Sequence, residues 1–382
     1  MRIFEHQGKD LYKKYGIPVP AGRLIDQKRE IKKIFPDIDQ GNGVVLKAQV
    51  LTGGRGKVQG IRFAKTVAEC ESQYDELIGM NISGHPVRKI LVEEKVKIQR
   101  ELYLGIIIDT EIGQPVMMIC SRGGADVEEI SKSHPECLEK IAIDVAYGLL
   151  DYPLRGTLIR LGLSKELFPS FMDISRKLYR FFIENDALFA EINPLILNDK
   201  GSLIAADARI DIDGAALYRH PEIQEMKASQ EMGIEDSLRD KYQLEYVELD
   251  GNIGLISGGA GLTMTAIDFM VMEGGRPACF MDCSANVSPT GYEMALRTLN
   301  SRKEVDCILM NIFGGITRMD RVGEYILEAL KRIGGVKKPL VIRLEGTDAV
   351  KGRAFIRDAG LPMCETFAEA VQQAVALGGK NG

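Results

Sequence analysis

The feature that most constrains the fold is a repeat of strand-length and helix-length segments in the last third of the chain. From Asn252 onward, short apolar runs alternate with longer segments whose apolar residues recur at helical spacing. Strands that are each followed by a helix run parallel, so the pattern predicts a doubly wound parallel sheet of the flavodoxin-like kind. The expected strands are 253–257, 278–282, 307–312, 340–344 and 362–365, and the expected helices are 262–273, 291–299, 321–333, 349–358 and 367–377.

The first half of the chain shows a different pattern, in which Gly and Pro separate shorter segments. Strand-like runs flank turn sequences and predict antiparallel pairs, which makes this an α+β domain. The expected pairs are 44–50 with 60–64, 101–109 with 115–121, and 189–197 with 202–210, and helices are expected at 67–77, 135–149 and 174–185. The charged segment 219–247 is expected to be a helical connector. We therefore expect one domain over residues 1–240 and a second over 250–382, with the boundary near Asp250.

Composition narrows the class of protein. The 382 residues include 49 Lys and Arg and 54 Asp and Glu, and a net charge of −5 argues against a nucleic-acid partner. No run of 18 apolar residues and no apolar signal-peptide core is found, which favours a cytoplasmic protein without membrane contact. Seven cysteines without a CxxC pair favour reduced, buried thiols, and the four histidines fit no hydrolase triad. Gly, at 40 residues, exceeds its usual share and indicates tight turns or phosphate-sized loops.

The strongest local motif is Lys47-Ala48-Gln49-Val50-Leu51-Thr52-Gly53-Gly54-Arg55-Gly56-Lys57, a strand that runs into a glycine-rich basic loop. Glycines let backbone N–H groups approach phosphate oxygens, and Arg55, Lys57 and Lys47 add charged donors, so the segment predicts a phosphate site. It is not a Walker A loop, because no Gly-Lys-Ser/Thr sequence opens a helix here. A surface hairpin with solvated cations is the alternative.

A second motif places polar residues on two neighbouring strands. Glu191 and Asn193 alternate onto one face of a strand, and the returning strand brings Asp207 opposite them. Carboxylate and amide oxygens suit Mg²⁺ that is shared with nucleotide phosphates. The alternative is a sheet face whose polar residues hydrogen-bond one another. Glu93, Glu94 and Glu101 stand at strand ends, where solvated side chains are the simpler interpretation.

Two glycine-rich loops follow strands of the expected parallel sheet. Residues 257–261 (Ser-Gly-Gly-Ala-Gly) open a helix, and residues 313–318 (Phe-Gly-Gly-Ile-Thr-Arg) have the same form. Helix N-terminal amides attract anions, and open α/β sheets bind ligands at the carboxyl ends of their strands. Tight packing of the turns is the alternative reason for these glycines.

Taken together, the motifs resemble the β subunit of succinyl-CoA synthetase, the nucleotide-binding subunit of the ADP-forming acyl-CoA synthetases. The resemblance covers nearly the whole chain. It rests on His6-Gln7-Gly8-Lys9, Tyr15-Gly16-Ile17-Pro18, Gly53 to Lys57, Glu101 to Gly105, Glu191 to Pro194, Leu249 to Gly254, Asn311 to Ile316 and Arg343 to Gly346.

The resemblance implies an ATP-grasp domain followed by a CoA-ligase domain, and it assigns roles to single residues. Nucleotide contacts would come from Lys47, Gly54, Arg55, Gly56, Glu93, Val96 and Glu101. Asn193 and Asp207 would hold Mg²⁺, and Glu191 would support a phosphohistidine. Gly258, Gly315, Ile316 and Thr317 would lie on the substrate side, and Pro20 favours ATP over GTP.

The resemblance also implies an acid–thiol ligase of the tricarboxylic acid cycle type whose work is divided between two chains. ATP phosphorylates a histidine of a separate α subunit, which also carries the CoA site. The phosphoryl group then passes to a carboxylate, and the CoA thiol displaces phosphate from the acyl phosphate. This chain would be inactive alone and would work as an αβ heterodimer or (αβ)₂.

Three departures from the family pattern concern the acid. Family members usually carry Asn at the position of Gly258, three glycines at Ser284-Ala285-Asn286 and often Val at Thr317. Added polar groups discriminate against acids that lack matching groups, so we expect succinate or a more polar short acid such as malate, citrate or sulfoacetate. The alternatives are a malate–CoA or citryl-CoA synthetase subunit, or a nucleotide-sensing subunit without phosphoryl transfer.

Overall fold

The computed structural model describes residues 1–52, 55, 58–124, 127–228, 234–283 and 287–379. The chain divides into two compact units, Met1–Gln230 and Glu231–Gly382, and each is described by itself. No helix in these described ranges is long and apolar enough to cross a membrane. All seven cysteines are free and buried, as the sequence predicts.

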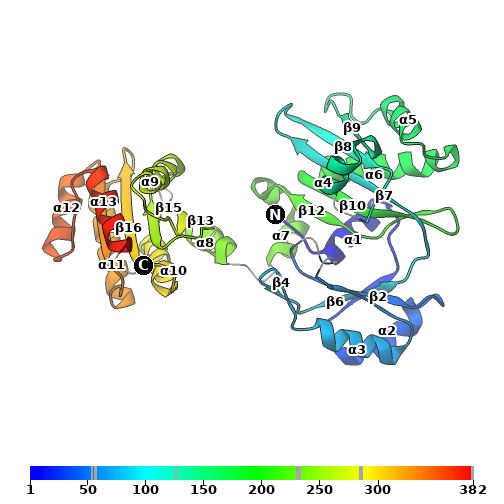
Figure 1. Cartoon of the computed structure of the whole chain (residues 1–382), viewed down its shortest axis with the longest axis horizontal. Helices are drawn as coiled ribbons and strands as arrows, with labels where there is room; N and C mark the ends of the chain where they lie inside the picture. The colour runs from blue at the N-terminus through cyan, green and yellow to red at the C-terminus, as the bar shows by residue number, and fades with distance from the viewer. Residues whose placement is uncertain (53–54, 56–57, 125–126, 229–233, 284–286, 380–382) are drawn as a thin grey trace. The chain divides into compact units, whose positions relative to one another are not determined.

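The first unit contains a small antiparallel sheet in the order β1-β6-β2-β3. Its apolar face packs against α2 and α3, which lie together below it in Figure 1. Helix α3 begins where the Thr66 hydroxyl accepts a hydrogen bond from the Glu69 amide, which satisfies a free N–H of the first turn. The elements are β1 (Gly22–Ile25), α2 (Ile31–Ile38), β2 (Val44–Ala48), β3 (Ile61–Ala64), α3 (Val67–Leu77), the hairpin β4 (Asn81–Ile82) and β5 (His85–Pro86), and β6 (Ile90–Glu94).

A larger antiparallel sheet completes this unit, in the order β11-β10-β7-β8-β9, with β12 paired to β10. Its core is formed with α1, α5 and α6, and the long strands β7 and β10 lie at its centre. The elements are α1 (Glu5–Lys14), β7 (Ile98–Asp109), β8 (Gln114–Cys120), α4 (Val127–Ser133), β9 (Leu138–Ala142), α5 (Asp151–Arg160), α6 (Phe168–Glu184), β10 (Ala187–Asn198), β11 (Leu203–Ala205), β12 (Arg209–Ile212) and α7 (Pro221–Ala228).

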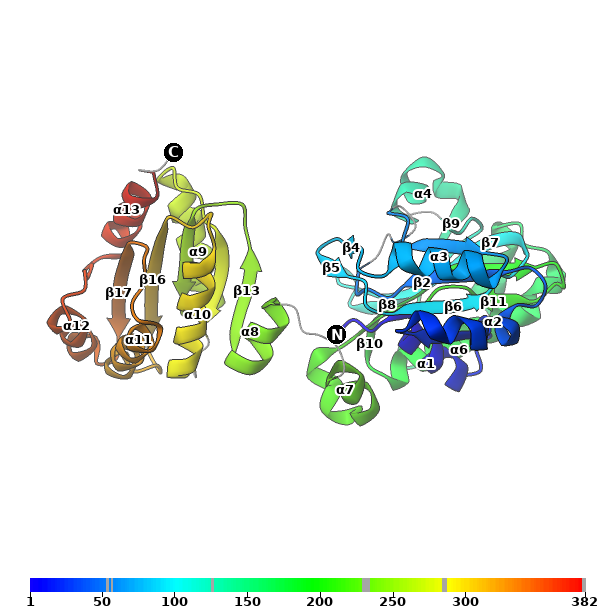
Figure 2. The same ribbon diagram turned by 90° about the horizontal axis from the view of Figure 1, so that it is seen from below.

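The second unit is a sheet in the order β13-β15-β14-β16-β17 with helices on both faces, as Figure 2 shows. Helices α9 and α13 pack on one face, and α8, α10, α11 and α12 contribute to the core on the other. The elements are α8 (Ile234–Tyr242), β13 (Leu244–Glu248), β14 (Ile253–Ser257), α9 (Ala260–Met272), β15 (Cys279–Cys283), α10 (Pro289–Ser301), β16 (Cys307–Gly314), α11 (Met319–Ile333), β17 (Leu340–Gly346), α12 (Ala349–Asp358) and α13 (Phe367–Gly378).

The predicted fold class is confirmed, with three local corrections. The helix expected at 135–149 is wrong, because residues 138–142 form β9 along the edge of β8. The expectation that the connector is helical up to residue 247 is also wrong, because residues 244–248 form β13. In this strand buried Leu244 and Tyr246 alternate with exposed neighbours, and the strand pairs antiparallel with β15. The strand expected at 362–365 is reduced to one bridge between Ile342 and Met363. The expected hairpins are confirmed, including the turn at 198–201.

Candidate functional site

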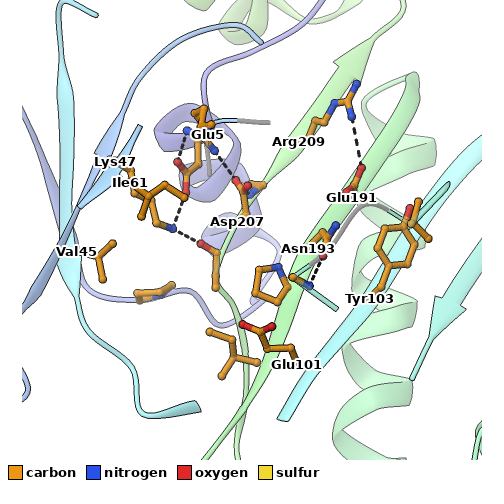
Figure 3. A pocket seen from close by; sticks show the side chains of 18 of the residues that line it. Glu5, Val45, Lys47, Ile61, Glu101, Tyr103, Glu191, Asn193, Asp207 and Arg209 are labelled. Carbon is orange, nitrogen blue, oxygen red and sulfur yellow. Dashed lines mark hydrogen bonds and ion pairs between the residues drawn. The ribbon is translucent and has the colours of Figure 1, made fainter. Parts of the chain in front are cut away.

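A cavity of about 1150 Å³ lies within the first unit and is lined by residues of both of its sheets. Figure 3 shows Lys47 and Asp207 together with Glu5, and Glu191 and Asn193 nearer to Tyr103. The predicted residues that line it are Lys47, Arg55, Glu93, Val96, Glu101, Glu191, Asn193 and Asp207. The fold thus collects the predicted phosphate, nucleotide and metal residues around one space. Gly54 and Gly56 lie outside the described residues.

The cations of the predicted phosphate site are held by a buried carboxylate from the first helix. Glu5 of α1 is 3% exposed. One of its oxygens accepts from Lys47 Nζ at 2.9 Å, and the other accepts from Arg55 Nη1 at 2.6 Å. Lys47 Nζ also donates to the Ala206 carbonyl, and Arg55 Nη1 to the Ala48 carbonyl at 3.1 Å. The alternative of a solvated surface hairpin is therefore wrong for Lys47 and Arg55, which are buried.

Glu5 belongs to a cluster that contains three carboxylates and three cations. Lys9, one turn along α1, contacts Glu5 at 2.8 Å and both oxygens of Glu93 at 2.6 Å. Glu93 Oε2 also lies 2.9 Å from Lys47 Nζ, and Asp207 completes the set through Arg55. The charges of these six side chains cancel, which offsets the cost of burying them.

Electrostatics within this cluster favour the charged form of Glu5. Burial alone would raise the pKa of the Glu5 carboxyl, but Arg55, Lys47 and Lys9 outweigh burial and hold the pKa well below its usual range. At Lys47, burial would lower the pKa, but the carboxylates of Glu5, Glu93 and Asp207 outweigh burial and keep the pKa above the ordinary lysine value. Glu5 and Lys47 therefore stay charged at neutral pH.

The predicted metal residues lie on β10, which carries Asn193, and on the link between β11 and β12, which carries Asp207. Asp207 Oδ1 accepts from Arg55 Nη2 at 2.9 Å and from the Ala208 amide at 2.7 Å. Asn193 Oδ1 accepts from the Gly124 amide at 2.8 Å. Both residues line the cavity. Their oxygens suit a hard cation such as Mg²⁺, and Asp207 contacts Arg55, so the predicted metal site and the predicted phosphate site meet at this pair.

Glu191 faces the same cavity two residues before Asn193. Its side chain is 12% exposed, and Oε2 lies 3.9 Å from Arg209 Nη1. The backbone around it is fixed, because the Glu191 carbonyl accepts from the Tyr12 hydroxyl at 3.2 Å and the residue pairs with Gly105 of β7. A carboxylate held in this way can accept a hydrogen bond from a group that enters the cavity.

The remaining nucleotide candidates lie on β6, on β7 and on the short segment that joins them. Val96 and Glu101 line the cavity, and burial raises the pKa of the Glu101 carboxyl above its ordinary value. Glu93 is 2% exposed, so the expectation of a solvated strand end is wrong for it. Its burial results from the ion pairs with Lys9 and Lys47 rather than from apolar packing alone.

In the second unit, the two predicted glycine loops share one rim, because β14 and β16 are parallel neighbours. The Gly259 amide donates to Asp282 Oδ1 at 2.6 Å, so this helix-start amide already has an anionic partner. The Gly315 carbonyl accepts from the Thr347 hydroxyl at 2.7 Å. Ile316 is 94% exposed. The four predicted substrate residues, Gly258, Gly315, Ile316 and Thr317, thus lie at the carboxyl ends of neighbouring strands. Ser284, Ala285 and Asn286 lie outside the described residues.

Sequence reasoning missed three residues of the cavity region: Glu5, Lys9 and Tyr103. Glu5 and Lys9 have the i, i+4 spacing that brings charges together on a helix, but nothing in that spacing showed that the pair would be buried. Tyr103 alternates with Glu101 and Gly105 on one face of β7. That alternation with the nucleotide candidate Glu101 could have indicated that Tyr103 faces the cavity.

Comparison with known proteins places both halves of the chain in described families. Residues 2–197 match the ATP-grasp domain, and residues 256–377 match the CoA-ligase domain. In fold, the chain is similar to an ATP citrate lyase from Methanothrix soehngenii, determined in complex with citrate and coenzyme A. The TM-score is 0.74 with 16% identity, covering 98% of this chain and 99% of that one. The architecture is therefore an ATP-grasp unit joined to a CoA-ligase unit.

Curated relatives match along the full length. The β subunit of an ADP-forming succinate–CoA ligase from Pyrobaculum arsenaticum is 39% identical over 99% of both chains. That of Chloroflexus aggregans is 39% identical over 98% of both. The chain belongs to the family of ADP-forming succinate–CoA ligase β subunits, and the predicted family resemblance is confirmed.

Proposed function

We propose that this chain is the nucleotide-binding β subunit of an ADP-forming carboxylate–CoA ligase, which converts ATP, a carboxylate and CoA into ADP, phosphate and an acyl-CoA. One observation carries the proposal: a single cavity gathers Lys47, Arg55, Glu191, Asn193 and Asp207. Membership of the succinate–CoA ligase family supports it. We propose ATP-grasp and CoA-ligase functional domains over residues 1–240 and 250–382.

In this proposal Lys47 and Arg55 bind the phosphates of ATP. Glu5 already holds both cations at the cavity, which orders them before an anion arrives. Gly54, Gly56, Glu93, Val96 and Glu101 complete the nucleotide contacts. Val96, on the segment between β6 and β7, and Glu101, on β7, both line the cavity, where adenine and ribose would contact apolar and acceptor groups.

Asn193 and Asp207 would hold Mg²⁺, and their oxygen chemistry fits that ion. Within the described residues no group of three or more His, Cys, Asp or Glu side chains is placed to bind a metal. The ion would therefore share its remaining ligands with phosphate and water, as Mg²⁺ commonly does. When bound, Mg²⁺ neutralises phosphate charge. Asp207 would then turn from Arg55 to the ion, which frees Arg55 for phosphate.

Glu191 would support the histidine that receives the phosphoryl group. Its carboxylate accepts a hydrogen bond from the imidazole ring and orients it toward the γ-phosphate. We propose that this histidine and the CoA site belong to a separate α subunit, in an αβ or (αβ)₂ assembly in the cytoplasm. Seven free, buried thiols suit a reducing compartment.

The rim of the second unit would receive the acid. Gly258, Gly315, Ile316 and Thr317 present backbone groups and one hydroxyl, which suit a short carboxylate. We propose succinate or a more polar acid such as malate, citrate or sulfoacetate, because Gly258 and Thr317 differ from the usual family residues.

The decisive experiment reconstitutes the chain with its α subunit and supplies γ-labelled ATP and Mg²⁺. We expect the label on an α-subunit histidine. This label should then appear in free phosphate when the carboxylic acid substrate and CoA are added. Absence of labelled histidine would favour a nucleotide-sensing subunit.

A second experiment compares the turnover of succinate, malate, citrate and sulfoacetate by the assembled enzyme. If succinate is clearly the best substrate, the proposal of a more polar acid is contradicted.

A further inference from the structure

One buried polar atom at the cavity has no use in the function described so far. Tyr103 of β7 is 1% exposed, and its hydroxyl has no hydrogen-bond partner among the described residues. Leaving a buried hydroxyl unpaired costs about 1–3 kcal/mol. Such groups are rare in folded proteins and call for an explanation.

The surroundings of this hydroxyl are built to accommodate it. The Tyr103 ring packs with Cys120, Ile130 and Cys137, which fixes its position. A Cβ atom at Gly105 would lie 2.6 Å from the hydroxyl oxygen, so only glycine leaves room for it. An alanine there would force the ring to move.

The hydroxyl lies beside Glu191 on the face of the sheet that lines the cavity. Tyr103 and Gly105 alternate onto one face of β7, and Gly105 pairs with Glu191 of β10. Paired residues of antiparallel strands point to the same side, and Asn193 follows on that side. Figure 3 shows the hydroxyl end of Tyr103 turned toward Glu191.

The hydroxyl keeps its proton at any physiological pH. Burial raises the pKa of Tyr103, and the negative charge of Glu191 raises it further. The group is therefore a hydrogen-bond donor that lacks an acceptor. Phosphate oxygens are the acceptors that this cavity is proposed to receive.

We propose that Tyr103 is a catalytic residue whose hydroxyl donates a hydrogen bond to the phosphoryl group during its transfer beside Glu191. The inference rests on the proposed function. In the step, the bond between the γ-phosphorus and the β–γ bridging oxygen breaks, and its electron pair stays on ADP. A bond forms between that phosphorus and the free ring nitrogen of the α-subunit histidine. The proton on the other ring nitrogen stays hydrogen-bonded to Glu191, and the Tyr103 proton stays on tyrosine.

The test replaces only the hydroxyl, in Tyr103→Phe of the full chain assembled with its α subunit. Loss of one donor aimed at developing charge costs about 100-fold in rate, so we expect histidine labelling from γ-labelled ATP to slow by that factor. ADP affinity of the chain should stay within about twofold of wild type. The melting temperature should stay the same or rise, because an unsatisfied buried polar atom has been removed.

Tyr74→Phe is the matched control. Tyr74 is also buried in the first unit, but its hydroxyl donates to the Asp26 carbonyl at 2.6 Å and does not line the cavity. This variant should lose thermal stability and keep the wild-type labelling rate. A structural role for Tyr103 would make the two variants behave alike, with lower stability and little change in labelling.

Gly105→Ala gives a second route to the same answer. The added methyl displaces the Tyr103 hydroxyl, so Gly105→Ala alone should slow histidine labelling. In the Tyr103→Phe background there is no hydroxyl to displace, so Gly105→Ala should change the labelling rate little further, and the two effects should not add. Wild-type labelling in Tyr103→Phe, or additive effects of the two substitutions, would overturn the inference alone. Failure of the wild-type pair to label histidine would instead overturn the proposed function.

Discussion

The cavity of the first unit and the rim of the second differ in what they are made of. The cavity carries a cluster of charged side chains, in which Glu5, Lys47, Arg55 and Glu93 are buried and paired with one another and with Lys9 behind them. The rim is built from backbone, with Phe313 and Ile316 exposed. A site of paired side chains is positioned by the chain itself, whereas an exposed backbone rim acquires its specificity from what binds against it. The following predictions test that contrast.

The largest effect is expected at the metal end of the cavity, in Asp207→Asn. This change removes the proposed carboxylate ligand and the charge that pairs with Arg55, so labelling of the α-subunit histidine should fall about 1000-fold. Half-maximal labelling should need more Mg²⁺. Asp211→Asn is the control, because Asp211 lies on β12 and pairs with Arg2 at 3.3 Å without lining the cavity. Equal losses in both variants would count against a metal role.

Glu5→Gln tests whether the cavity is organised by its buried charges. Removing one partner of a buried ion network costs about 3 kcal/mol, since Lys47, Arg55 and Lys9 all contact this carboxylate. We expect that loss in the free energy of unfolding, measured by urea denaturation and circular dichroism. Glu184→Gln, which breaks an exposed pair with Arg180, should cost less than about 1 kcal/mol.

The difference in the free energy of unfolding between wild type and Glu5→Gln should also depend on pH. The pKa of Glu5 is lowered in the folded state, so its contribution to stability is present above the unfolded glutamate value of about 4.3 and is lost as pH falls through the folded pKa. The stability gap between wild type and Glu5→Gln should therefore narrow below about pH 4. A gap that stays constant from pH 7 to about pH 3 would show that the charge of Glu5 is not the cause.

At the rim, Gly346→Ala should act through backbone rather than charge. Gly346 has a φ of 117°, and an added Cβ would lie 2.1 Å from the Gly314 carbonyl oxygen. We expect a loss of about 2 kcal/mol and slower acyl-CoA formation, with histidine labelling unchanged. Gly360→Ala is the control, because its φ is 75° but no atom lies within 4 Å of the added Cβ. Slower histidine labelling in Gly346→Ala would contradict the separation of phosphoryl transfer at the cavity from acyl-CoA formation at the rim.

The smallest effect is expected in Gly258→Asn, which restores the usual family residue. The nearest atom to an added Cβ is Ile312 Cγ2 at 3.4 Å, an ordinary contact, so the side chain fits. The ratio of succinate to malate turnover should rise by less than about tenfold, the range of one polar contact. Thr317→Val should shift the ratio in the same direction. If the turnover ratio changes in neither variant, Gly258 and Thr317 do not select the acid.

Local patterns predicted most of the elements, and they failed where a neighbouring strand decided the outcome. Segment 138–142 was expected to be helical, but the open edge of β8 offers hydrogen bonds that convert it into β9. Leu244 and Tyr246 likewise became buried only because β15 lies beside them. Single-segment periodicity carries no information about such an edge.

By itself, the sequence determined the types of chemistry: the basic glycine loop, the Glu191 and Asn193 alternation, and the two glycine loops after parallel strands. Only the tertiary structure decided which of these groups share a space and in what state. It placed Glu5 against Lys47, which is 42 positions away in the chain, and it buried Glu93 against Lys9. Beside Glu191, it left the Tyr103 hydroxyl without a partner in the part of the chain that the structure describes. Burial, pairing and charge balance depend on residues far apart in the chain, and no local spacing encodes them.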